Sequence, residues 1–234
     1  MLKNKNHAII LARGGSKGIK NKNIIKINNK TLLYWTIKAC LQTKSIDKIW
    51  VSSDSKKILA IAKKMGASII YRPKRLSTDS SSSESGWLHG IKEINKKFGV
   101  KNIIALQATS PIRGKKDLTE ALKLFEKKKC DSLFSSTPLD AHFSWNKLKN
   151  RIIPNYNIKI QRKRRQDINE KIIENGSFYI FSASKFQKIK KRLFGKIIHY
   201  NQSKYKSFEI DRKEDILIIE AILKKYNKKL NLVS

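Results

Sequence analysis

Two glycines followed by a group of cationic side chains occur in residues 10–23, ILARGGSKGIKNKN. Gly14 and Gly15 have no side chains, so the backbone can approach a ligand closely, and successive N–H groups in such a turn can bind an anion. Arg13 offers a planar guanidinium that suits phosphate oxygens. Three lysines add point charges: Lys17, Lys20 and Lys22. The turn predicts a site for a multiply charged anion such as a triphosphate, and an ordinary basic turn is the alternative, since neither GxxxxGK[ST] nor GxGxxG is present.

A second candidate site lies near the end of the chain, where Glu209 and Asp211 flank Ile210. In an extended segment alternate side chains point to the same side, so both carboxylates would face the same way. Two carboxylates together with triphosphate oxygens suit Mg²⁺, which prefers oxygen ligands and keeps several waters. The alternative is that Asp211 caps a helix that begins at Arg212.

The elements that would position these residues alternate along the chain. Apolar, β-branched segments predict strands at 7–12, 48–53, 67–71, 102–107 and 132–136. Helical spacing and capping residues predict helices at 31–42, 55–65, 85–98 and 117–128. This alternation predicts an α/β fold with a mostly parallel sheet and helices on both faces. Ligands bind at the carboxyl ends of such strands, which is where Arg13–Asn23, Arg72 and Gln107–Arg113 fall.

Two stretches interrupt the alternation. The serine-rich segment 77–85, STDSSSSES, is either a flexible linker or a loop that faces a substrate, and its position between a strand and a helix favours the loop. Residues 138–170 contain prolines, isolated aromatic residues and the basic run QRKRRQ. We expect 138–170 to leave the sheet as a dimerisation arm within a single domain, 1–234. Strands return at 177–181 and 196–200, before a last helix at 212–226.

Composition narrows the classes of partner. The chain has 52 Lys and Arg against 18 Asp and Glu, a net charge of +34. The lysine clusters are scattered over many elements, which favours a lysine-rich surface over a nucleic-acid footprint. No apolar run reaches the ~18–20 residues of a membrane span, and AIILA is too short for a signal-peptide core. Cys40 and Cys130 give neither a disulfide framework nor zinc spacing. We therefore expect a cytoplasmic protein with no membrane or nucleic-acid partner.

Several separate stretches, in this order, resemble the cytidylyltransferases that activate nonulosonic acids, namely the CMP-sialic acid synthetases and their legionaminic- and pseudaminic-acid relatives. The matching stretches are AxxxARGGSKGIKNKN (8–23), VSSDS (51–55), RPKRLSTDSSSS (72–83), LQATSPIR (106–113), RQDINEKIIENGSFYIF (165–181) and EIDRKEDI (209–216). The resemblance implies a three-layer, Rossmann-like nucleotidyltransferase fold and a homodimer. It also implies that the C2 hydroxyl of a sugar acid attacks the α-phosphorus of CTP, which yields a CMP-sugar and diphosphate.

The resemblance also implies a role for individual residues. Catalytic roles fall on Arg13, Lys22 and Asp211. Binding of CTP falls on Arg13, Gly14, Gly15, Ser16, Lys17, Lys22, Asn23, Arg72, Ser81 and Ser83. Binding of the sugar falls on Gln107, Arg165 and Tyr179. Binding of Mg²⁺ (or Mn²⁺) falls on Asp211 and Glu209. The family usually has an aspartate at both positions, whereas this chain has Glu209 at the first, so we expect Asp211 to be the main ligand. Nucleotidyl transfer needs such an ion.

Alternatives to this function remain open on the sequence. The acceptor can be another keto-sugar acid, such as Kdo, legionaminic acid or pseudaminic acid, because the sequence does not identify which sugar binds. A non-enzymatic alternative is a basic protein that binds polyanions, whose binding would fall steeply with added salt.

Overall fold

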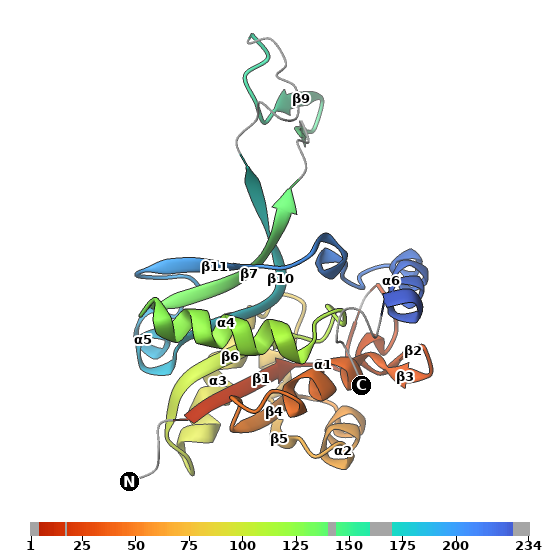
Figure 1. Cartoon of the computed structure of the whole chain (residues 1–234). Coiled ribbons are helices and arrows are strands. Elements are labelled where there is room, and N and C mark those ends of the chain that lie inside the picture. Colours follow the sequence, from red (N-terminus) through yellow and green to blue (C-terminus); the bar gives the residue numbers. More distant parts are fainter. Residues whose placement is uncertain (1–4, 17, 140–143, 160–169, 227–234) are drawn as a thin grey trace.

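A seven-stranded sheet organises the chain (Figure 1), as a computed structural model of residues 5–16, 18–139, 144–159 and 170–226 shows. The strand order is β11-β7-β10-β6-β1-β4-β5. The bounds are β1 (Lys5–Leu11), β4 (Lys48–Ser53), β5 (Ser68–Tyr71), β6 (Val100–Gln107), β7 (Ser132–Leu139), β10 (Lys171–Ser182) and β11 (Ile197–Asn201). All neighbours pair in parallel except β10, which is antiparallel to β6 and β7. The predicted mostly parallel sheet is confirmed.

Helices cover both faces of the sheet and make three layers. One core packs α1 (Leu32–Leu41), α2 (Lys56–Lys64) and α4 (Lys115–Lys127) against the sheet. The other packs α3 (Ser83–Asn95) and α5 (Ala183–Ile189) against the opposite face. The alternation along β1 explains why Ala8–Leu11 are all apolar, since Ala8 and Ile10 face the first core and Ile9 the second.

Capping side chains decide where two of the helices begin. Ser55 accepts a hydrogen bond from the N–H of Ile58 at the start of α2. Ser82 accepts one from the N–H of Ser85, so α3 starts at Ser83 rather than at the predicted residue 85. The serine-rich segment is therefore partly a helix start, and not a free linker.

A third apolar cluster brings the end of the chain beside its beginning. The helix α6 (Lys213–Tyr226) packs Ile219, Ile222 and Leu223 against residues from the loop after β1, the short strand β2 (Lys26–Ile27) and α1. Strand β2 pairs with β3 (Lys30–Thr31). Ile210, which lies between the two acidic residues, is fully buried in the same cluster. This packing places the acidic pair next to the basic N-terminal loop.

A hairpin lies apart from the main sheet. Strands β8 (Trp145–Leu148) and β9 (Arg151–Pro154) pair only with each other, and Figure 1 shows them standing away from the body at the end of β7 and β10. Pairing between β7 and β10 continues to Leu139 and Lys171, so Pro138 still belongs to the sheet. The role of this hairpin in dimerisation stays a prediction. Within the described ranges, no helix has both the length and the apolar character needed to cross a membrane.

Candidate nucleotide-binding site

A cavity of about 400 Å³ opens at the carboxyl ends of β1 and β6, beside the loop that follows β5. This volume is within the range of small-molecule sites. Four segments line it: Leu11–Asn23 after β1, Arg72–Ser83 after β5, Gln107–Thr109 at the end of β6, and Asp211. Most of the residues proposed from the sequence therefore come together, although they are far apart along the chain.

Three cations line the cavity, two of which pair with carboxylates. Nη2 of Arg13 lies 2.7 Å from Oδ1 of Asp79, and Nζ of Lys22 lies 2.9 Å from Oδ1 of Asp211. The third, Arg72, is 4% exposed, and its Nε donates to Oγ of Ser77 at 2.9 Å. Burial lowers the pKa of Arg72, which the nearby Asp54 partly opposes. These three cations outnumber the two carboxylates that line the cavity, so the described wall favours an anionic ligand.

The two glycines of the N-terminal turn do not lie on the cavity wall. The N–H of Gly14 donates to Oδ1 of Asp54 at 2.8 Å, and a Cβ at Gly14 would lie 3.0 Å from Cβ of Ser55. A Cβ at Gly15 would meet open space. The amide of Gly14 thus has a carboxylate acceptor in this structure, and the anion nest at Gly14 and Gly15 stays a prediction. Close approach is needed instead at Gly18, which lines the cavity and whose Cβ would lie 2.7 Å from the carbonyl oxygen of Asp211.

The remaining nucleotide candidates in the described chain lie on the wall. Nδ2 of Asn23 donates to the carbonyl of Arg13 at 2.9 Å, so Asn23 holds the basic loop in shape. Three serines line the cavity: Ser16, Ser81 and Ser83. Oγ of Ser81 donates to the carbonyl of Arg75 at 3.2 Å, which orders the serine-rich loop. The serine-rich segment is thus a loop that faces the cavity. Lys17 lies outside the described residues.

The acidic pair divides into an exposed and a partly buried carboxylate. Asp211 lines the cavity, with its side chain 68% exposed. The N–H groups of Asp211 and Arg212 both donate to Oδ2 of Asp215, at 2.8 and 2.7 Å. Asp215 therefore caps the start of α6, and the alternative that Asp211 does so is wrong.

Glu209 does not line the cavity. Its Oε1 accepts from Oγ of Ser110 at 2.9 Å, and a Cβ at Gly176, where φ is +65°, would lie 2.6 Å from the same oxygen. Burial raises the pKa of Glu209, although the bond from Ser110 opposes the shift. Glu209 is therefore held between the β6–α4 loop and β10.

The donors present fit a phosphate-bound magnesium ion better than a metal held by protein alone. Within the described residues, no group of three or more His, Cys, Asp or Glu side chains gathers where it could hold a metal. Mg²⁺ commonly takes one or two carboxylates and completes its coordination with phosphate oxygens and water. Asp211 meets this requirement, since its exposed carboxylate faces the cavity that would hold the triphosphate.

Of the two sugar-binding candidates within the described residues, one lies on the cavity wall. Gln107 lines it, whereas Arg165 lies outside the described residues. Tyr179 is 2% exposed and packs on Trp87, and its hydroxyl donates to Glu174 and lies 3.4 Å from Nη1 of Arg192. The predicted direct contact of Tyr179 with the sugar is therefore not supported, because the strand alternation directs this side chain into the core under α3.

Sequence reasoning missed three residues that shape the site. Asp79 forms an ion pair with Arg13, and Asp54 accepts a hydrogen bond from the amide of Gly14. Thr109 lines the cavity. The place of Asp79 as one of two acidic residues in the serine-rich segment was the only available signal for it. The other two follow strands of the predicted sheet, but their partners could not be read from the sequence.

Solved structures that resemble this chain are nucleotidyltransferases. A CMP:2-keto-3-deoxy-manno-octonic acid synthetase complexed with CTP superposes with a TM-score of 0.72 at 14% identity, covering 94% of this chain and 99% of that chain. A 4-diphosphocytidyl-2C-methyl-D-erythritol synthase from Anaerococcus prevotii gives 0.68 at 15% identity, covering 95% and 99%. The fold is therefore the three-layer α/β fold of nucleotidyltransferases, as predicted.

The sequence model of the family described as cytidylyltransferase matches residues 7–233, so the chain belongs to the cytidylyltransferase family. Its relatives include the N-acylneuraminate cytidylyltransferase of Oncorhynchus mykiss, 37% identical over 186 residues, or 77% of this chain and 42% of that protein. The Escherichia coli O18:K1:H7 enzyme of the same name is 30% identical over 233 residues, 94% and 52% of the two chains. The pseudaminic acid cytidylyltransferase of Campylobacter jejuni is 33% identical over 187 residues, 77% and 79%. The chain spans about half the length of the N-acylneuraminate cytidylyltransferases it matches.

Proposed function

We propose that this protein transfers a cytidylyl group from CTP to a sialic-acid-like sugar, so that CTP and an acylneuraminate give a CMP-acylneuraminate and diphosphate. The observation that carries the proposal is the meeting of Arg13, Lys22 and Asp211 at one cavity, at the carboxyl ends of the strands. Membership of the cytidylyltransferase family and the names of the relatives support the same reaction.

In this mechanism the protein acts through positioning and charge. The guanidinium of Arg13 and the ammonium of Lys22 would bind the phosphates, and both would leave their present carboxylate partners to do so. Arg72 and the serine-rich loop would bind the base. Asp211 would hold the magnesium ion, whose charge would offset that of the phosphates. The rest of the cavity wall, including Gln107, would place the sugar C2 hydroxyl in line with the α-phosphorus.

The acceptor is proposed as a nonulosonic acid, with its identity open among several members. The relatives include both N-acylneuraminate and pseudaminic acid cytidylyltransferases. The Kdo-type synthetase among the solved structures, whose likeness lies in its fold, keeps another keto-sugar acid as the alternative. Gln107 and the unplaced Arg165 remain the proposed contacts to the acid.

A homodimer and a cytoplasmic location complete the proposal. Four large apolar side chains of the β8–β9 hairpin are 38–63% exposed: Trp145, Leu148, Ile152 and Ile153. Such a surface favours contact with another protein surface. We propose that a second copy of the chain covers it, which sedimentation of the purified protein would test.

The reaction is tested by measuring diphosphate release with CTP, Mg²⁺ and a panel of acids: N-acetylneuraminic, legionaminic, pseudaminic and Kdo. We expect release to require CTP, the metal and one nine-carbon acid. Absence of release with every acid, together with polyanion binding that weakens steeply as salt rises, would support the non-enzymatic alternative instead.

A further inference from the structure

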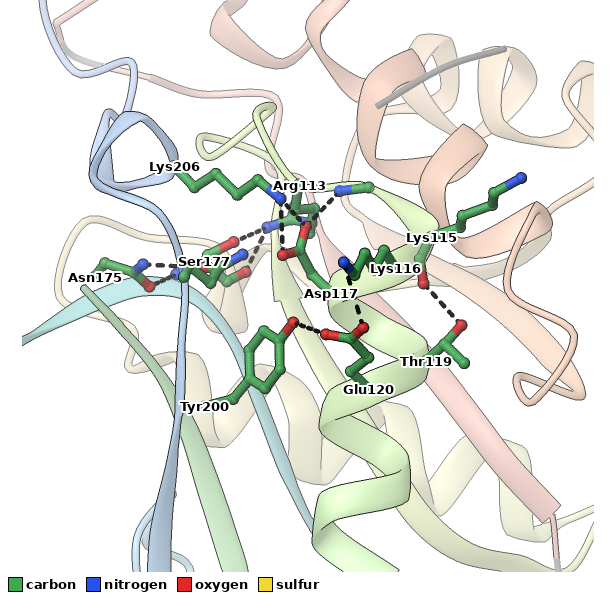
Figure 2. A network of polar contacts seen from close by, with 12 residues as sticks. Arg113, Lys115, Lys116, Asp117, Thr119, Glu120, Asn175, Ser177, Tyr200 and Lys206 are labelled. Carbon is green, nitrogen blue, oxygen red and sulfur yellow. Dashed lines mark hydrogen bonds and ion pairs between the residues drawn. The ribbon is translucent and has the colours of Figure 1, made fainter. Parts of the chain in front are cut away.

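A buried ion pair joins the turn η4 (Lys204–Ser207) to the first turn of α4 (Figure 2). Nζ of Lys206 lies 2.8 and 2.7 Å from the two carboxylate oxygens of Asp117. The two side chains are 9% and 4% exposed. Lysine and aspartate are seldom so buried, and the desolvation of such a pair can exceed the energy that the pairing returns. The pair is therefore a weak source of stability, but it holds residue 206 at one position.

Asp117 is itself tightly held. It is the third residue of α4, and its Oδ2 accepts from the N–H of Gly114 at 2.8 Å, which caps the helix. Asp117 thus offers Lys206 a partner whose own position does not depend on Lys206.

Arg113 holds the loop that leads into α4. Its side chain is 1% exposed. Its guanidinium donates to Oγ of Ser177 at 2.9 Å, to Oγ1 of Thr36 at 2.8 Å, and to the carbonyls of Ser177 and Gln107. Burial lowers the pKa of Arg113 to about 10, so the group is still charged at neutral pH. The loop that gives Gln107 and Thr109 to the cavity is therefore tied to β10 and α1.

The acidic segment is attached to this same loop. Lys206 precedes Asp211 by five residues. Between them, the N–H of Ile210 donates to the carbonyl of Thr109 at 2.9 Å, and Glu209 accepts from Ser110. The segment therefore contacts the β6–α4 loop and the start of α4 at residues 206, 209 and 210. Like Glu209 and Ile210, Lys206 does not line the cavity, so its contact with Asp117 can be changed without changing the cavity wall.

We propose that Asp117 and Lys206 are positioning residues, which hold the segment Glu209–Asp211 in the place where it binds the metal–triphosphate. The inference rests on the function proposed above. Because the Asp211 side chain is exposed, its position depends on the backbone that carries it. Without the ion pair, that backbone keeps only its attachments at 209 and 210 within this loop, and the carboxylate would occupy a wider range of positions.

The test replaces the pair without leaving a buried charge. In the double variant Asp117→Asn/Lys206→Met, the amide oxygen still accepts from Gly114 and the Met fills the volume of the Lys stem. Replacement of a buried pair by uncharged side chains is often neutral for stability. The matched control is Tyr200→Phe. The Tyr200 hydroxyl donates to Glu120 at 2.8 Å, so this contact also joins α4 to a neighbouring element, but not to the acidic segment.

Two readouts separate positioning from stability. The first is the binding of Mn²⁺ to the protein in the presence of CTP, followed by electron paramagnetic resonance without any sugar. We expect a loss on the order of tenfold in the double variant, as for outer-shell partners of metal ligands, and no change in Tyr200→Phe. The second is hydrogen exchange in a peptide that contains the Ile210 amide, which we expect to exchange faster in the double variant while a peptide from the end of α4 does not.

The outcomes are distinct. A folded double variant with wild-type Mn²⁺ binding and wild-type exchange at Ile210 overturns the inference, and so does an equal effect of Tyr200→Phe. If the double variant does not fold, Lys206→Met alone decides by the same two readouts, because Asp117 keeps the hydrogen bond from Gly114 and the nearby charge of Arg113. If the wild-type protein binds neither CTP nor Mn²⁺, the proposed function fails, and the exchange at Ile210 still decides whether the pair positions the segment.

Discussion

Replacement of Arg13 by alanine tests the site most directly, because the free protein and the bound state make different demands on this side chain. In the free protein Arg13 pairs with Asp79, and the two side chains are 32% and 45% exposed. An ion pair of this exposure contributes about 0–1 kcal/mol to folding. Arg13→Ala should therefore change the free energy of unfolding by no more than about 1 kcal/mol.

The loss in the reaction should be much larger. With CTP bound, we expect the guanidinium to make two charge-assisted hydrogen bonds to phosphate, each contributing about 1.5–3 kcal/mol. Their removal costs about 3–6 kcal/mol of transition-state stabilisation, which corresponds to a roughly 10²- to 10⁴-fold fall in kcat/KM. The displacement of Asp79 in the wild type reduces this figure, so we expect the lower half of the range.

The assay is diphosphate release at saturating acceptor and Mg²⁺ with CTP varied, alongside thermal unfolding. Asp79→Ala is the control, since it breaks the same ion pair and keeps the guanidinium. We expect its kcat/KM to stay within about tenfold of wild type or to rise, because the phosphate no longer competes with a carboxylate. Folded Arg13→Ala protein with kcat/KM within tenfold of wild type would refute the assignment of Arg13 to the phosphates.

Three further predictions concern the metal, the loop and the pH dependence. Asp211→Asn should raise the Mg²⁺ concentration that gives half-maximal activity, or remove activity, and an unchanged metal titration would place the ion elsewhere. Gly18→Ala should lower activity because its Cβ would lie 2.7 Å from the Asp211 carbonyl, whereas Gly15→Ala, facing open space, should have nearly wild-type activity; equal activities would argue against the close approach. Burial acts to raise the pKa of Glu84, but the hydrogen bond and the charge of Arg192 together with a backbone hydrogen bond outweigh it, and the net pKa lies below the ordinary 4.5. The stabilisation is therefore present above pH 4.5 and lost as pH falls through the lowered pKa, so Glu84→Gln should flatten that part of an acid-unfolding curve; a curve as steep as that of the wild type would contradict this.

The elements of the fold were readable from local patterns. Strands at 7–12, 48–53 and 102–107 appear within a residue or two of their predicted limits, because the middle of a strand buried on both faces is a continuous apolar run. Helix starts were less well predicted. Helix α4 begins at Lys115 rather than at 117, since Asp117 caps from inside the first turn.

The site was predictable as a set of residues but not as a set of contacts. Arg13, Lys22 and Asp211 were all named from the sequence, and all line one cavity. The direction of each group was not predictable. The amide of Gly14 turns to Asp54, and Tyr179 turns into the core, although both had been assigned to ligands. A side chain's direction depends on which elements pack against it, and that information is not local.

The sequence alone determined the succession of strands and helices along the chain, the family signature and the basic character of the loop after the first strand. These follow from short-range periodicity and from residue types within one segment. The tertiary structure decided which charges meet: Lys22 with Asp211, Arg13 with Asp79, and Lys206 with Asp117. Asp211 also shows the difference, since only the packed start of α6 reveals that Asp215 caps the helix and leaves Asp211 facing the cavity. Such pairings depend on distances between residues far apart in the chain, which exist only once the sheet and its helices have packed.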